Sequence, residues 1–350
     1  MKIKPLKIVV SLILVMVTSC NEPETVITNI VHPDGSVTRK LEMRSLLDND
    51  FRISDIQVPF DSTWSVRDSV EINDNGDTIW VKRAEKLFTD VNEINRDYLT
   101  DSSANNEIRR RAEFRKRFKW FNTEYRFAEI IERTMEHGYP VADFLNEEEL
   151  KWFYTPENIA IGKLTGADSI KFRALSDSVD VKSDKWMYKS LVAEWIAKLM
   201  ELAAEKPGVD EAVGKLKQNE DFIVSLVIAD EESFDSLWLN DIILREIIGE
   251  ENTLLLRADA DSAAKITGEY VLKRFLPYRV IIRMPGEIIG TNGFIDSARI
   301  LLWPTNSNFF LTEPYVMYAE SKTVNKWAWI VSGIFLLFVL AGVILWIIKR

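Results

Sequence analysis

Polar and apolar residues alternate with a period of two near the start of the chain. The alternation covers residues 24–43, with a break at Pro33-Asp34-Gly35-Ser36, and again residues 64–86, with a break at residues 73–77. Successive side chains of a β-strand point to opposite faces, and Asn75-Gly76 supplies the positive φ values of a tight turn. The sequence therefore predicts two β-hairpins in this region.

Apolar residues in the middle of the chain recur mostly at helical spacing. Residues 106–117 have a helical pattern, residues 121–127 alternate as a strand, and residues 147–154 form a short predicted helix. The clearest helix spans residues 185–206, with Asp184 as its N-cap and an end at Pro207-Gly208. Its apolar stripe consists of Tyr188, Leu191, Val192, Trp195, Leu199 and Leu202. Further helices are predicted within residues 210–249 and 261–275.

Strand character returns after the helical region. Residues 279–303 contain two predicted strands with turns at Pro285-Gly286 and Asn292-Gly293, and residues 315–320 form a third strand. Strands near both ends of the chain would leave open edges unless they pair with each other. We therefore expect residues 24–45 and 278–320 to share one sheet. The predicted fold class is α+β, with sheet parts at about 24–100 and 278–320 and a mainly helical insertion at about 106–275.

The C-terminal segment is an apolar run from Trp327 to Ile348 with no charged residue. About 20 such residues span a bilayer, and tryptophans near both ends of the run suit the headgroup zone. A buried helix of a soluble domain is the competing interpretation, but such a helix would need a polar face. We predict a single transmembrane helix at 327–348 and a cytoplasmic tail at 349–350.

The N-terminal segment has the pattern of an export signal, in which three lysines precede an apolar run. This run ends at Val17-Thr18-Ser19-Cys20, which resembles a bacterial lipobox. The resemblance implies a signal peptide at 1–19 and a lipoprotein with palmitate-type acylation at Cys20, the single cysteine of the chain. An ordinary buried or reactive thiol is the alternative.

The two predicted anchors place residues 20–325 on one side of a membrane. That side is extracytoplasmic, so the predicted location is the bacterial inner membrane with the bulk of the chain in the periplasm. Removing three lysines of the signal and two cations of the tail from the net charge of −10 leaves −15 for the exported body. Such a charge excludes nucleic acid as a partner.

The strand order and anchors resemble the LppM-like lipoprotein domains. The features that carry the likeness are the lipobox, the early hairpin with its Asp34-Gly35-Ser36 turn, the hairpin containing Pro285-Gly286 and Asn292-Gly293 before Trp303, and the C-terminal span. The resemblance implies one sheet made from both ends of the chain and a function in binding lipid or another apolar ligand. Residues 46–268 depart from it as an insertion that compact members lack.

Catalytic motifs are scarce. The chain has two histidines, His32 and His137, both expected in loops, and no Cys/His cluster or phosphate-binding glycine pattern. Glu147-Glu148-Glu149 suits a helix N-terminus, and Asp259 with Asp261 suits a cap. The acidic turn at residues 73–77 lacks the ligand spacing of a calcium loop. We predict no enzyme activity, no cofactor and no metal.

One basic segment stands out from the acidic background. Phenylalanines and a tryptophan are interleaved with cations between residues 109 and 121. Anionic lipid headgroups or another anionic envelope polymer are its candidate partners, since each cation near such a surface contributes about 1 kcal/mol. Ion pairing with the surplus carboxylates of the body is the alternative. The cations are Arg109, Arg110, Arg111, Arg115, Lys116, Arg117 and Lys119.

Three functional classes remain open. The first is a membrane-tethered extracytoplasmic binding or scaffold module of the bacterial cell envelope, with the membrane and other envelope proteins as partners. The second is a lipid- or apolar-ligand-binding protein. The third is a hydrolase that uses carboxylates. A deep apolar pocket would favour the second, and two convergent carboxylates in a cleft would favour the third.

Overall fold

The chain forms an α+β structure in two compact units. The computed structural model describes residues 23–46, 51, 58–101, 108–155, 166–229, 241–272, 277–295 and 300–350, so the predicted signal peptide and Cys20 lie outside the described residues. The β unit comprises Pro23–Ile131, Tyr278–Trp303 and Val316–Arg350. The helical unit comprises Glu132–Pro277 and Pro304–Tyr315. The helical unit is therefore an insertion in sequence, and it begins later than the predicted residue 106.

A seven-stranded sheet in the β unit joins the two ends of the chain. Strand β1 pairs antiparallel with β2, from Glu24↔Arg44 to Val31↔Val37, and parallel with β7, from Thr25↔Tyr278 to Ile30↔Arg283. This confirms that the N-terminal hairpin shares a sheet with strands from the C-terminal region. The prediction that residues 278–320 as a whole join this sheet was wrong, because Glu287–Thr291 and Tyr315–Val324 belong to a second sheet. The strand order is β3(Ser65–Ile72), β4(Thr78–Phe88), β2(Val37–Ser45), β1(Glu24–Val31), β7(Tyr278–Arg283), β10(Leu301–Thr305) and β9(Phe294–Ile295).

A second, four-stranded sheet in the same unit has the order β5(Arg110–Phe118), β6(Asn122–Ile131), β11(Tyr315–Val324) and β8(Glu287–Thr291). The helix predicted at residues 106–117 was wrong, because Arg110–Phe118 pairs with β6 along its full length. Arginine, lysine, glutamate and alanine favour helices, but a long antiparallel partner outweighs that preference. Helix α2(Val91–Thr100) belongs to this unit and buries Ile94 and Tyr98.

Helices make up most of the helical unit. Of the predicted stripe, Trp195 and Leu199 are buried in one apolar cluster and Leu191 in a second, and Tyr188 packs against both. Leu202, the last residue of the stripe, is exposed. The unit contains α3(Glu147–Phe153), α5(Gly166–Leu202), α6(Val209–Gln218), α7(Glu220–Ala229) and α9(Ile242–Leu272), with short 3-10 turns η4(Val141–Asp143) and η5(Ser307–Phe310).

The predicted helix ends in this unit were partly wrong. Helix α5 begins at Gly166, so Asp184 lies inside it and is not an N-cap. Asp259 and Asp261 lie inside α9, so they do not cap a helix either. The prediction for Glu147–Glu149 is confirmed, since these residues form the first turn of α3. Periodicity locates a helical face but gives no signal for where a long helix begins.

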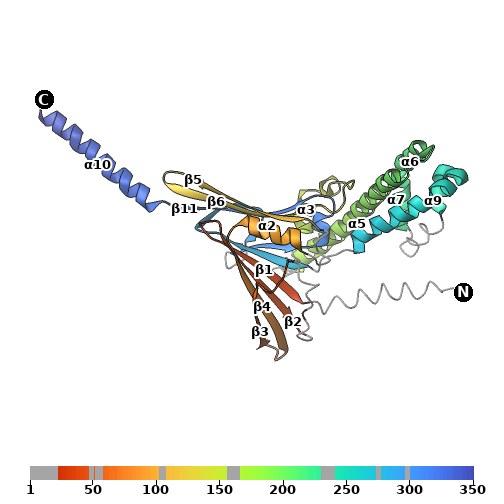
Figure 1. The fold of residues 1–350 in the computed structure, drawn as a ribbon, viewed down its shortest axis with the longest axis horizontal. Coiled ribbons are helices and arrows are strands. Elements are labelled where there is room, and N and C mark those ends of the chain that lie inside the picture. The colour runs from red at the N-terminus through yellow and green to blue at the C-terminus, as the bar shows by residue number, and fades with distance from the viewer. Residues whose placement is uncertain are drawn as a thin grey trace. The chain divides into compact units, whose positions relative to one another are not determined.

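Helix α10(Lys326–Ile348) follows β11 after a single residue, Asn325 (Figure 1). Within the described part of the chain it is the one helix that is long and apolar enough to cross a membrane. Ala328 is its one buried residue. An apolar surface on every side is typical of a membrane span and not of an amphipathic surface helix.

Candidate functional site

The predicted basic segment forms the β5–β6 hairpin. The two strands pair from Arg110↔Ile131 to Phe118↔Thr123. Two backbone hydrogen bonds close the turn, from Lys119 N to Asn122 O at 2.8 Å and from Asn122 N to Lys119 O at 3.1 Å. The two residues of the turn are Trp120 and Phe121, and both are exposed. An aromatic pair at a hairpin tip has no role in forming the turn, which points to a role in contact.

One face of this hairpin rests on the β1–β2 turn. Phe114 stacks on Tyr125 and lies so close to Gly35 that a Cβ there would be 2.9 Å from Phe114 Cε1. Gly35 also has a φ of +100°, which other residues rarely adopt. Lys116 Nζ donates to Pro33 O at 2.8 Å. The glycine of the predicted Asp-Gly-Ser turn thus has a packing role as well as a turning one.

Asn325, at the start of α10, is hydrogen-bonded to the hairpin tip. Its backbone N–H donates to Phe121 O at 2.9 Å, and its Nδ2 donates to Lys119 O at 2.8 Å and Trp120 O at 3.3 Å. Its Oδ1 accepts from Thr123 Oγ1 at 3.0 Å. This one side chain therefore satisfies several polar groups of the hairpin and fixes the tip to the residue that immediately precedes the helix.

Aromatic rings continue the contact along α10. Phe118 stacks on Trp327 with ring centroids 6.2 Å apart, and Trp120 meets the same ring edge-on at 5.2 Å. Phe121 lies 4.5 Å from Trp329. Trp120 Nε1 donates to Ser332 Oγ at 2.9 Å. We call Phe118, Trp120, Phe121, Trp327 and Trp329 the aromatic clasp.

The aromatic clasp lies at the N-terminal end of α10, and its position along the helix axis can be compared with the thickness of a bilayer. The 23 residues of α10 extend about 35 Å at ~1.5 Å per residue, slightly more than the ~30 Å hydrocarbon core of a bilayer. Ser332 lies about 9 Å along the axis from Lys326 on the same rise. In a bilayer crossed by α10, the hairpin tip therefore reaches the headgroup zone, where tryptophan is enriched.

The seven predicted cations differ in their exposure to solvent. Arg110 is buried at 8% exposure, pairs with Asp101 at 3.4 Å and lies 4.6 Å from the centre of the Tyr98 ring. Its place in the predicted contact surface is wrong, because its guanidinium is directed into the β unit. The other six cations are exposed.

The exposed cations near the tip are only partly neutralised. Lys119 pairs with Glu124, and Arg115 lies 3.9 Å from Glu113, which also pairs with Arg111. Arg109 and Arg117 make no ion pair with any residue that the structure describes. Some of the cations therefore pair internally, as the alternative interpretation predicts, while the tip keeps an excess of positive charge. Contact with an anionic surface stays a prediction.

A buried ion-pair network lies elsewhere in the β unit. Arg39 of β2 donates to Asn29 Oδ1 at 2.8 Å, Tyr98 Oη at 2.8 Å and Glu129 Oε1 at 3.0 Å. Asn29 Nδ2 donates to Glu129 Oε2 at 2.9 Å, and Tyr98 also donates to Glu129. All four side chains are buried. The network links β1 and β2 of one sheet to α2 and to β6 of the other.

Electrostatics keep this network charged. Burial has the largest single effect and lowers the pKa of Arg39, but the Glu129 carboxylate and Tyr98 together outweigh it, so the pKa lies above its usual value. Burial raises the pKa of Tyr98, so its phenol stays protonated and donates. Paired, hydrogen-bonded charges of this kind specify how elements meet, and they leave no open site for a substrate.

Both histidines of the chain have hydrogen-bonding or ion-pair neighbours, and they lie in different units. His32 Nε2 is 2.9 Å from Thr38 Oγ1. His137 Nδ1 is 3.3 Å from the Glu194 carboxylate in the helical unit. No group of three or more His, Cys, Asp or Glu side chains in the described ranges could hold a metal ion.

The cations stand out in the sequence, but the residues that position them do not. Asn325 and Ser332 carry no motif, and their partners lie about 200 positions away. The sequence did hold one signal for the strand. Phe114, Lys116 and Phe118 alternate with Arg115 and Arg117, as residues on the two faces of a strand do.

Comparisons with known protein families, with curated proteins and with solved structures find no match for this chain.

Proposed function

We propose that this chain is a membrane-tethered extracytoplasmic binding or scaffold module of a bacterial cell envelope, whose β5–β6 hairpin docks on anionic headgroups beside its own membrane span. One observation carries the proposal. The hairpin tip is hydrogen-bonded and stacked onto the first turns of the apolar helix α10. If α10 spans a membrane, the hairpin therefore lies at the surface of that membrane.

The charge and the rings of the hairpin suit the two layers of that surface. The rings of the aromatic clasp would occupy the interface between headgroups and hydrocarbon, which amphipathic aromatic rings prefer. Arg115, Lys116, Arg117 and Lys119 precede or flank the tip, so they would lie at the level of lipid phosphates. Each contributes about 1 kcal/mol next to an anionic leaflet. This contact would fix the orientation of the β unit relative to the bilayer.

The lipidation of Cys20 and the inner-membrane location belong to the same proposal. An acyl chain at Cys20 would add a second attachment point on the side from which the hairpin approaches. The LppM-like resemblance and an apolar-ligand function remain part of the proposal as its alternative.

The test measures the depth of the hairpin in a bilayer. The full chain with Cys20→Ser receives one new cysteine at Arg117, carries an environment-sensitive fluorophore there, and is reconstituted into vesicles that contain headgroup-spin-labelled lipid. A matched label at Asn75, in the β3–β4 turn, is the control. We expect strong quenching at position 117 and weak quenching at 75. Equal quenching at both positions would contradict the docking.

A further inference from the structure

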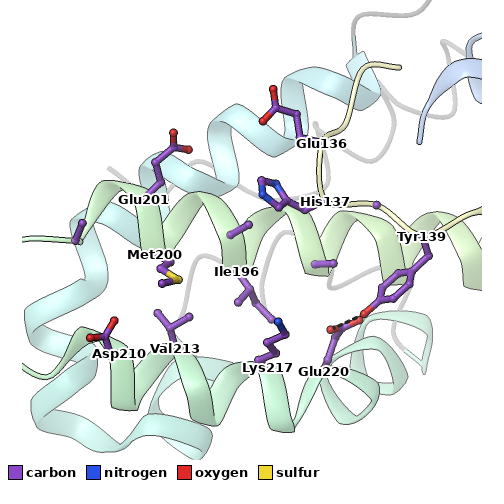
Figure 2. A pocket seen from close by; sticks show the side chains of 14 residues that line it. Glu136, His137, Tyr139, Ile196, Met200, Glu201, Asp210, Val213, Lys217 and Glu220 are labelled. Atoms are coloured by element: carbon purple, nitrogen blue, oxygen red, sulfur yellow. Dashed lines mark hydrogen bonds between the residues drawn. The ribbon is translucent and has the colours of Figure 1, made fainter. Parts of the chain in front are cut away.

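The helical unit has a groove between α5, α6 and the loop of residues 136–139, with a volume of about 720 Å³ (Figure 2). Its floor is apolar and comes mainly from one face of α5, where Ala193, Ala197 and Met200 follow helical spacing, and Ala204 lies in the turn after the helix. The three positions on α5 extend over about 10 Å at ~1.5 Å per residue. The small alanine side chains leave room for another backbone to approach this face.

The rim of the groove is acidic. Glu136, Glu201, Asp210 and Glu220 line it together with Lys217, and Lys198 pairs with Glu201 at 2.8 Å. Figure 2 shows Glu220 at one end of the groove and Asp210 with Glu201 toward the other. A ligand that matches this rim carries positive charge near both ends of an apolar body.

Glu220 gives an independent sign of a missing partner. It is 8% exposed, and its Oε2 accepts from Tyr139 Oη at 3.0 Å. Burial and this carboxylate raise the pKa of Tyr139 to about 12, so the phenol remains a donor. Glu220 Oε1 is buried and has no hydrogen-bond partner among the described residues. A buried carboxylate oxygen without a donor is costly, so a cationic donor from a ligand would be favoured there.

The loop that forms the upper rim is held in place before any ligand arrives. The fully buried carboxylate of Glu194 accepts from the backbone N–H of Glu136 at 3.1 Å and of His137 at 2.7 Å. Tyr139 N donates to Ser190 Oγ at 3.2 Å. A Cβ at Gly138 would lie 2.4 Å from Thr312 Cγ2, so the loop packs closely at that position. Such a rim loses little freedom on binding, which favours affinity.

From these features we propose that the groove binds a helical segment of a partner polypeptide, which lays a narrow apolar face on α5 and places a lysine or arginine against the acidic residues at each end. The inference deepens the proposed scaffold function by naming the chemistry of the partner. A helix in a groove makes contacts along one of its faces, and the alanine-rich floor offers such a face about two turns of α5. A small organic cation would satisfy Glu220 but leave the other end of the groove empty.

The test uses the full chain in nanodiscs of zwitterionic lipid and a fluorescent amphipathic peptide of leucine and lysine that is helical over at least three turns. Binding is measured by anisotropy at about 0.15 M salt, where general charge attraction is screened beyond ~8 Å. The probe variants are Met200→Lys, which places a cation in the groove, and Glu220→Gln. The control is Leu202→Lys, because Leu202 is exposed to a similar extent on the same helix, at 44% against 50% for Met200, but lies outside the groove.

We expect Met200→Lys to weaken peptide binding by about tenfold or more, which corresponds to ~1.4 kcal/mol, and Leu202→Lys to leave it unchanged. Glu220→Gln should weaken binding as well. If Glu220→Gln does not fold because its site is buried, Met200→Lys alone decides the outcome. Equal losses for the two lysine variants, or no binding of the peptide, would overturn the proposal. Displacement of the peptide by octylammonium at similar concentration would assign the groove to a small amphiphile and overturn the polypeptide partner. The hairpin experiment has a separate readout, so either proposal can fail alone.

Discussion

Trp120 Nε1 donates a hydrogen bond to Ser332 Oγ across 2.9 Å, although the two residues are 212 positions apart in the chain. The indole belongs to a hairpin turn, and the hydroxyl belongs to the second turn of the apolar helix α10. Near the hydrocarbon both groups would be costly without a partner. Their pairing would therefore let the hairpin tip enter the edge of a bilayer in the docking that we propose, and it ties the hairpin to the helix.

Removal of the Asn325 side chain should loosen this coupling. Asn325→Ala deletes three hydrogen bonds to the tip, while the ring contacts of the aromatic clasp remain. We expect faster backbone hydrogen exchange at residues 119–122 in the reconstituted chain, with little change in the seven-stranded sheet. Asn308→Ala, in the helical unit, is the matched control. Unchanged exchange at the tip would mean that the rings alone hold it.

The charge of the hairpin should decide its lipid preference. Replacing Arg115, Lys116, Arg117 and Lys119 by Gln should abolish the preference of the chain for anionic over zwitterionic lipid, measured by lipid co-purification. The melting temperature should change little, because exposed charges contribute about 0–1 kcal/mol to stability. Salt should weaken the wild-type preference through screening.

A control with the same change in net charge separates this effect from general electrostatics. The control variant replaces four exposed cations outside the hairpin by Gln, namely Arg67, Arg173, Lys185 and Lys265. If the control loses the preference for anionic lipid to the same extent, the hairpin is not a specific contact surface.

Much of the fold could be predicted because its signals are local. Alternation around Asp34-Gly35 and Asn75-Gly76 identified both N-terminal hairpins. The requirement that edge strands find partners predicted that the two ends of the chain share a sheet, and the pairing of β1 with β7 is where they meet. Residues 106–117 failed because a charged, alanine-containing segment has helical preference by itself. Its strand state depends on β6, a partner that the local pattern does not reveal.

The candidate site was predictable in its charges and not in its geometry. The basic segment stands out in any acidic chain, but Arg110 could not be distinguished from Arg111 without knowing that β5 turns one side inward. The Arg39–Glu129 pair joins residues 90 positions apart. Contacts of that range depend on how sheets and helices pack, and no motif in the sequence marks them.

The two predicted anchors can be separated by one substitution. Cys20→Ala should abolish metabolic labelling with palmitate, because acylation requires the thiol. The variant should stay in the membrane fraction, since a spanning helix holds a protein more strongly than acyl chains do. Deletion of α10 is the complementary variant and should leave attachment dependent on Cys20. Release of Cys20→Ala into the soluble fraction would contradict the assignment of α10 as a span.

The buried ion-pair network should dominate the stability of the β unit. Arg39→Met leaves Glu129 buried without its cation, so we expect a loss of about 3–5 kcal/mol in the free energy of unfolding. Replacing both residues by Met should restore part of that loss, because no lone charge remains. Arg44→Met on the same strand is the control, and its more exposed pairs with Glu42 and Glu71 predict a loss of about 1 kcal/mol or less. Equal losses for Arg39→Met and Arg44→Met in denaturant titrations would contradict a special role for the buried pair.

Glu149 should make the helical unit sensitive to acid. The Lys182 ammonium, then the backbone N–H of Asn146 and the Ser178 hydroxyl, lower the pKa of Glu149 from 4.5 to about 2. A carboxyl group whose pKa is lower in the folded state stabilises that state fully above its unfolded pKa, and the contribution is lost as pH falls through the folded value. We therefore expect Glu149→Gln to reduce the thermal midpoint of the helical unit at pH 7, and the difference from wild type to shrink between about pH 4.5 and pH 2. Glu148→Gln, an exposed neighbour in the same helical turn, controls for the general effect of charge at the N-terminus of α3. A difference between Glu149→Gln and wild type that stays constant over this pH range would show that the side chain acts through packing or its capping contact, and not through its charge.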